Sequence, residues 1–225
     1  MSNDDEVLLQ VKTWWQRYGT TVLLAVAIGL FAFAGNRFWQ NSQLESAVAA
    51  QGLQEQLTTI SQRLINNPED TAANGDLQRI GRQIMDEYPR TPQATDAALM
   101  LAARSVDSND LAAAEKHLRW ALGRKPAADT RALIEVRLAR VLAANDKAED
   151  ALVMLANIKD PALAPMVDEI KGDILLQQGQ LDAAAKAYQS ADAALAAAGE
   201  ERPLLALKLA DVGLEPAPRE QESVQ

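Results

Sequence analysis

The chain has 225 residues, 48% of them hydrophobic and 24% charged, which leaves room for one moderate domain and an appendage and excludes a wholly disordered or wholly membrane-embedded protein. It has no cysteine, so disulfides, thiol catalysis and cysteine metal sites are excluded. The net charge of −9 arises entirely after Trp39, because three acidic and three basic side chains cancel before it. An acidic body repels phosphate backbones, which excludes nucleic acid as the principal partner. Abundant alanine, with only 11 glycines and 9 prolines, predicts an all-α fold.

The most apolar stretch, "TTVLLAVAIGLFAFAG", occupies residues 20–35. It lies among 19 uncharged residues between Arg17 and Arg37, enough at about 1.5 Å of rise each to cross a hydrocarbon layer roughly 30 Å thick. Aromatic and basic residues flank the stretch, as they do at membrane interfaces. These interface residues are Trp14, Trp15, Tyr18, Arg37, Phe38 and Trp39. We therefore predict a transmembrane anchor, surrounded by membrane lipid, at residues 18–39.

A cleaved signal peptide is the main alternative for this stretch, because Ala32, Phe33 and Ala34 form an A-x-A-like cleavage site. Against cleavage, no polar segment separates the apolar run from that site, and an aromatic pair follows at once. A helix buried in a soluble core is a third interpretation. The pattern favours the anchor over both.

The basic residues near the two ends of the anchor indicate its orientation. Lys12 and Arg17 precede it, while only Arg37 follows closely. This bias predicts a cytoplasmic segment at residues 1–17 and places the remainder on the far side of the membrane, which in a bacterium is the periplasm. Residues 40–212 are then a periplasmic helical domain at the bacterial inner membrane.

Two amphipathic helices are predicted directly after the anchor. Apolar residues recur every three to five positions from 40 to 66, and Pro68 ends that helix. A polar loop is expected as far as Gly75, followed by a second helix over residues 76–88.

Further along, the chain repeats itself. "LAAAEKHLRWAL" from Leu111, "AEDALVMLANIK" from Ala148 and "LDAAAKAYQSAD" from Leu181 align, each with a small residue followed by a large one four positions later. A turn and another apolar helix precede each passage, although only the third turn contains a glycine, Gly179. Helix pairs repeated at about 34 residues are typical of tetratricopeptide repeats. An ordinary alanine-rich helical bundle with accidental periodicity is the alternative.

The end of the chain is predicted to close the repeat array. "RPLLALKLADVGL", residues 202–214, reads as a short helix whose leucines cover the open end of the stack. Residues 213–225 are polar and contain prolines, and we expect a disordered tail.

The sequence contains no recognisable catalytic arrangement. Its single histidine, His117, lies within a predicted helix, where an exposed position is expected, and no nucleophile elbow or phosphate loop is present. Asp168, Glu169 and Asp173 cluster along one helix, which a solvated face explains. We therefore expect no enzyme, no metal and no cofactor; an enzyme with an unrecognised site is the least favoured interpretation.

Arrays of helix pairs offer a curved surface, lined by the first helix of each pair, that holds peptides or partner proteins. By resemblance to other tetratricopeptide domains, the groove residues here would be Leu99, Ala103, Val136, Arg140, Glu169 and Asp173. Arg140 is the residue expected to pair with a carboxylate or a chain end. The alternative is that Arg140 is only a surface charge.

Taken in order, the acidic amino terminus, the tryptophan-rimmed anchor, "RLARVL" from Arg137, "IKGDILLQQGQ" from Ile170 and "LLALKLADV" from Leu204 resemble the bacterial YfgM-like family. These are tetratricopeptide-containing ancillary subunits of the SecYEG translocon. The resemblance implies an inner-membrane protein whose partners are the translocon, a membrane-tethered periplasmic chaperone of the prolyl-isomerase type, and exported client proteins. The alternative function is a soluble periplasmic repeat adaptor, released by cleavage after Ala34, that coordinates cell-envelope processes.

Overall fold

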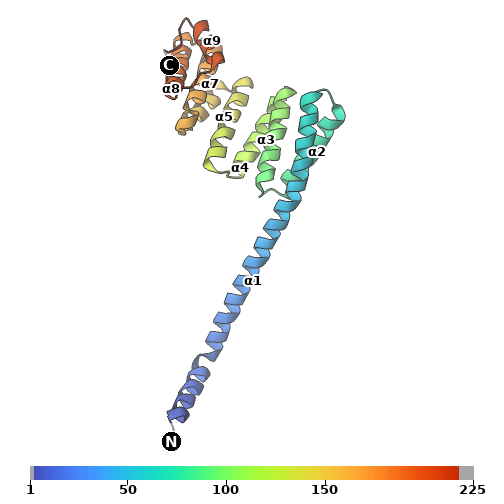
Figure 1. The fold of residues 1–225 in the computed structure, drawn as a ribbon, viewed down its shortest axis with the longest axis vertical. Helices are drawn as coiled ribbons and strands as arrows, with labels where there is room; N and C mark the ends of the chain where they lie inside the picture. The colour runs from blue at the N-terminus through green and yellow to red at the C-terminus, as the bar shows by residue number, and fades with distance from the viewer. Residues whose placement is uncertain (1–2, 218–225) are drawn as a thin grey trace, which may run out of the picture. The chain divides into compact units, whose positions relative to one another are not determined.

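The computed structural model describes residues 3–217, and the regular structure in that range is helical throughout, which confirms the all-α prediction (Figure 1). The chain divides into two compact units, Met1–Gly52 and Leu53–Gln225. The elements are α1 (Asn3–Asn66), α2 (Thr71–Glu87), α3 (Pro92–Asp107), α4 (Leu111–Gly123), α5 (Ala128–Ala144), α6 (Ala148–Asn157), the 3-10 turn η1 (Pro161–Leu163), α7 (Ala164–Gln177), α8 (Leu181–Ala197) and α9 (Pro203–Asp211).

Helix α1 combines two predicted segments, the anchor and the helix over residues 40–66, in one helix. Within the described residues, no single helix is long and apolar enough to cross a membrane. The arms Lys12–Thr21 and Val26–Asn66, which lie at 43° to each other, meet that requirement of length and composition only when taken together.

Helix α2 begins five residues earlier than expected, so the prediction of a polar loop up to Gly75 is wrong. Asp70 is the N-cap residue: its carboxylate accepts a hydrogen bond from the backbone N–H of Ala73 at 2.9 Å and pairs with Arg63 at 2.6 Å. An aspartate at this position satisfies one of the free N–H groups at a helix start. The polar residues that suggested a loop therefore belong to the first turns of α2.

The predicted repeats form three helix pairs, α3 with α4, α5 with α6, and α7 with α8 (Figure 1). The small residues that align in the sequence, Ala114, Ala151 and Ala184, are completely buried. The large residues one turn later, which are Leu118, Leu155 and Tyr188, are buried as well. A small side chain lets two helices approach closely, and the large one fills the space beside it.

The turn between the helices of each pair has the same backbone conformation in all three repeats. Asn109, Asp146 and Gly179 occupy equivalent positions with φ of 59°, 57° and 74°. Asparagine and aspartate are the non-glycine residues that enter this left-handed region most readily, which explains why two repeats do without the turn glycine. In each turn the next residue donates its N–H to a carbonyl five residues back: Asp110 to Ser105 (2.8 Å), Lys147 to Leu142 (2.9 Å) and Gln180 to Leu175 (2.9 Å).

Two clusters of buried side chains form the core of the second unit. The larger extends from Leu57 in α1 to Ile174 in α7, and the smaller joins α8 to α9. Helix α9 contributes Leu205 and Leu209 to the smaller cluster, whereas Leu204 and Leu207 on its other side are exposed. Two of the four leucines expected to cover the end of the stack thus do so.

The predicted disordered tail, residues 213–225, is described only as far as residue 217. Leu214 packs against the smaller cluster, and the backbone N–H of Ala217 donates to the buried carboxylate of Asp192. Residues 218–225 lie outside the described part of the chain.

Candidate partner-binding groove

A pocket of about 510 Å³ lies among α3, α4 and α5. Its walls are mainly apolar, because α3, α4 and α5 each turn aliphatic side chains toward it. Val106 on its wall is 44% exposed, so the pocket opens to solvent. The lining residues are Leu99, Ala102, Ala103, Val106, Asp107, Leu111, Leu118, Arg137, Arg140, Val141 and Ala144.

Two guanidinium groups border this pocket. Arg137 and Arg140 lie three residues apart on α5, so they share one face of that helix, and both are exposed. Within residues 3–217, neither side chain has a hydrogen bond or an ion pair. Asp107, from the end of α3, is the acidic residue of the lining. The pocket therefore combines apolar walls with two cations that are available to a ligand.

Four of the six predicted groove residues lie on α3 and α5. Leu99, Ala103 and Arg140 meet at the pocket. Val136 is 1% exposed and belongs to the larger core cluster, so it supports α5 from inside. Arg137, which was not predicted, also lines the pocket, and it lies one turn before Arg140 on the same helix face.

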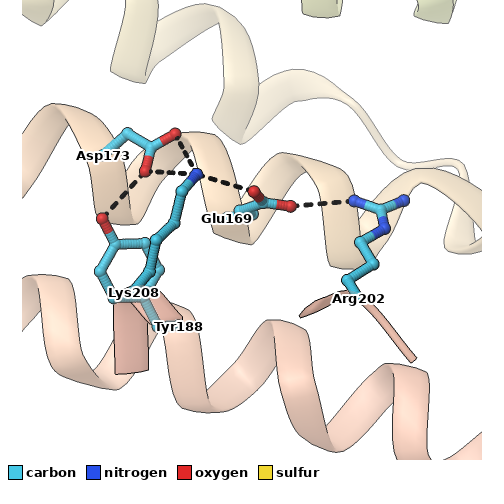
Figure 2. Close-up of polar contacts among 5 residues, drawn as sticks. All are labelled: Glu169, Asp173, Tyr188, Arg202 and Lys208. Carbon is cyan, nitrogen blue, oxygen red and sulfur yellow. Dashed lines mark hydrogen bonds and ion pairs between the residues drawn. The ribbon is translucent and has the colours of Figure 1, made fainter. Parts of the chain in front are cut away.

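Glu169 and Asp173, the other two predicted groove residues, bind cations of the chain itself (Figure 2). The Nζ of Lys208 in α9 lies 2.7 Å from Glu169 and 2.8 Å from Asp173, and Arg202 donates to Glu169 at 2.9 Å. The hydroxyl of Tyr188 donates to Asp173 at 2.9 Å. These five residues, which we call the α7–α9 network, hold the last helix against α7.

The ionisation of the α7–α9 network follows from its contacts. Burial alone would raise the pKa of Glu169, but hydrogen bonds and positive charge from Lys208 and Arg202 outweigh it, and the pKa is lowered. Burial alone would lower the pKa of Lys208, but the hydrogen bonds and negative charges of Asp173 and Glu169 outweigh burial, so the pKa is raised. Burial, and then the hydrogen bond to Asp173, raise the pKa of Tyr188. Glu169 and Lys208 are therefore both charged at neutral pH.

The predicted membrane-interface residues lie on α1. Trp14, Trp15 and Tyr18 are about half exposed, with the Trp14 ring centroid 6.0 Å from that of Tyr18 and 6.4 Å from that of Trp15. Arg37 and Phe38 are exposed at the other end of the apolar stretch, and the side chain of Trp39 lies outside the described residues.

His117 lies on α4 and is half-buried rather than exposed, beside a second, polar pocket that includes Arg82. Burial lowers the pKa of His117, and the charges of Lys116 and Arg82 lower it further, so the imidazole is neutral at pH 7. Among the described residues, no group of three or more histidine or carboxylate side chains is arranged to hold a metal ion.

A family model described as tetratricopeptide repeat-like domain matches residues 12–214. The chain belongs to this family. The match includes most of α1 as well as the repeats. It rules out the alternative that the chain is an ordinary helical bundle with accidental periodicity.

Curated relatives of the chain carry the name "Ancillary SecYEG translocon subunit", which confirms the resemblance to the YfgM-like family. The relative from Escherichia coli (strain K12) is 29% identical, over 84% of this chain and 86% of its own length. The one from Neisseria gonorrhoeae is 27% identical over 92% and 95%, and the one from Haemophilus influenzae 24% identical over 84% and 88%. No solved structure matches the chain.

Proposed function

We propose that this protein is a membrane-anchored periplasmic tetratricopeptide protein that associates with the Sec translocon. In this proposal a membrane-tethered periplasmic chaperone of the prolyl-isomerase type is its second partner, and newly exported proteins are its clients. The observation that carries the proposal is that relatives named as ancillary translocon subunits align with 84–92% of the chain. The alignment that covers 92% of the chain must include most of α1 together with the repeats, so it supports a shared role for both.

The side chains of α1 support the anchor. Between Arg17 and Arg37 the large apolar side chains that the structure describes are exposed, including Leu24, Ile28 and Phe31, the last of which is 81% exposed. Exposing such residues to water costs about 25 cal/mol per Å² of apolar surface, and a lipid environment removes that cost. The aromatic residues at the two ends suit the membrane interfaces.

Tethering is the mechanism that this arrangement favours. An anchor beside the translocon keeps the groove within reach of the channel exit and raises its effective concentration there. Weak contacts then suffice for transient binding, which suits a protein that meets many clients.

The test is protease accessibility and intact mass of the protein in membrane vesicles of known orientation, with purification of SecYEG from the same membranes. We expect a full-length chain that is cut only from the periplasmic side and that purifies with the translocon. A soluble product beginning at Gly35 would contradict the proposal and favour the released periplasmic adaptor, for which Ala32, Phe33 and Ala34 supply the cleavage site.

A further inference from the structure

Two cations with no ion pair among the described residues border the apolar pocket between α3 and α5. Other cations of the repeats are paired with carboxylates, as Lys147 and Arg119 are with Glu115, at 2.7 Å and 2.8 Å. Arg137 and Arg140 have no such partner within residues 3–217, although the chain carries a net charge of −9. Like charges three residues apart on a helix repel each other, and a bound carboxylate would relieve that repulsion.

The two acidic residues that were also predicted for the groove are not available to a ligand. Glu169 and Asp173, which would otherwise attract a basic segment, are already paired with Lys208 and Arg202 (Figure 2). The charge available to a partner in the groove is therefore mainly the pair of guanidinium groups on α5.

We propose that the pocket between α3 and α5 binds an apolar, acidic peptide segment of a partner protein, whose carboxylates pair with Arg137 and Arg140. The apolar walls and a volume of about 510 Å³ suit a few aliphatic side chains. Guanidinium groups bind carboxylates through two parallel hydrogen bonds, which fixes their position. Asp107 on α3 directs the carboxylates toward the α5 side. The chemistry of the bound peptide is inferred from the pocket alone, whereas the identity of the partner rests on the proposed function.

The test measures peptide binding to the full-length protein in nanodiscs of uncharged lipid by fluorescence anisotropy. The probes are three labelled peptides with the same leucines, carrying two glutamates, two glutamines or two lysines. We expect the glutamate peptide to bind about tenfold or more tightly than the glutamine peptide, because its contacts with arginine are charge-assisted. The lysine peptide should bind more weakly still.

Charge reversal makes the test specific to the pocket. Arg140→Glu should weaken binding of the glutamate peptide about tenfold or more. Arg131→Glu, an exposed site on the same helix outside the pocket, changes the net charge equally and should leave binding unchanged. The double variant Arg137→Glu with Arg140→Glu should prefer the lysine peptide. Ala103→Trp should fill the pocket and abolish binding of all three peptides with the charges intact.

Several results would overturn the assignment. These are equal binding of the glutamate and glutamine peptides, equal effects of Arg131→Glu and Arg140→Glu, and unchanged binding after Ala103→Trp. Self-association that Arg140→Glu abolishes, with no peptide binding, would make a second copy the occupant. If no peptide binds but SecYEG still purifies with the protein, the pocket assignment is wrong and the proposed function stands. If the glutamate peptide binds but SecYEG does not purify with the protein, the pocket assignment stands and the proposed function is wrong.

Discussion

Glu169 shows how one buried carboxylate fixes the position of an entire helix. Its side chain is 10% exposed and contacts two cations from the end of the chain, Arg202 and Lys208. A carboxylate at that depth must be paired, because an isolated charge would be strongly disfavoured. The α7–α9 network therefore ties the position of α9 to the ionisation of Glu169.

Glu169→Gln should destabilise the folded chain at neutral pH and should remove part of its acid sensitivity. The pKa of Glu169 is lower in the folded chain than its ordinary value of 4.5, so the carboxylate stabilises the fold above that value. This stabilisation is lost as the pH falls through the lowered folded-state pKa, while Lys208, whose pKa is raised, stays protonated. We expect a difference of about 1–3 kcal/mol at pH 7, reduced by the partial exposure of both cations, that shrinks below about pH 4.

Urea unfolding of the full-length protein in detergent, followed by circular dichroism between pH 3 and pH 7, measures this difference. Glu149→Gln is the control, because Glu149 is exposed on α6. A gap between wild type and Glu169→Gln that stays constant over this pH range would show that the lost contacts do not depend on ionisation.

Contacts between helices explain why particular small residues occur in the repeats. At Gly172 in α7, an added Cβ would lie 2.3 Å from Cε1 and 2.5 Å from Cδ1 of the Tyr188 ring in α8. The Tyr188 hydroxyl is held by Asp173, so the ring has little freedom to move away. A side chain at position 172 thus conflicts directly with the packing of the third helix pair.

Gly172→Ala should destabilise the protein even though alanine favours helix. Overpacking costs about 1–3 kcal/mol, while replacing glycine by alanine in a helix contributes up to about 1 kcal/mol. Gly75→Ala in α2 is the matched control, because no atom lies within 4 Å of the added Cβ and only the helix preference remains. Urea midpoints of the two variants should move in opposite directions; a higher midpoint for Gly172→Ala would mean that α7 and α8 separate easily.

Most of the helices could be predicted from the sequence because their apolar residues recur at helical spacing. The start of α2 could not be predicted, because Asp70 acts as an N-cap in a stretch whose composition resembles a loop. Within the groove, Leu99, Ala103 and Arg140 were predicted because the first helix of each pair faces inward. The burial of Val136 was missed, since repeat spacing alone does not show which positions of α5 the neighbouring helices cover.

The second unit is stabilised by contacts between helices that are near in sequence. Helix α7 belongs to both core clusters: Ile170 and Ile174 pack in the larger, and Leu175 and Leu176 pack against the smaller. Stability in such an array is approximately a sum over neighbouring units. This locality explains why the order of the repeats could be predicted, whereas the pairing of Glu169 with Lys208, 39 residues away, follows from no sequence pattern.

Removing residues 203–225 should therefore destabilise one end of the array and leave the other unchanged. The deletion removes Leu205 and Leu209 from the smaller cluster and takes Lys208 away from Glu169 and Asp173. Hydrogen exchange should accelerate in α8, while peptides from α3 and α4 should exchange as in the full chain. A uniform loss of protection would instead indicate that the second unit unfolds as one cooperative block.

The early start of α2 has a further consequence for chemical ageing. Asn74 and Gly75 form the dipeptide that deamidates most readily in flexible chains, where the glycine nitrogen attacks the asparagine amide. In α2 that nitrogen is held in the helical backbone, and the Asn74 side chain donates to the carbonyl of Asp70 at 3.0 Å while accepting from Arg104. Asn74 is thus kept from cyclising for as long as α2 stays folded, so the slow appearance of aspartate or isoaspartate at this position would record how often this part of the protein opens.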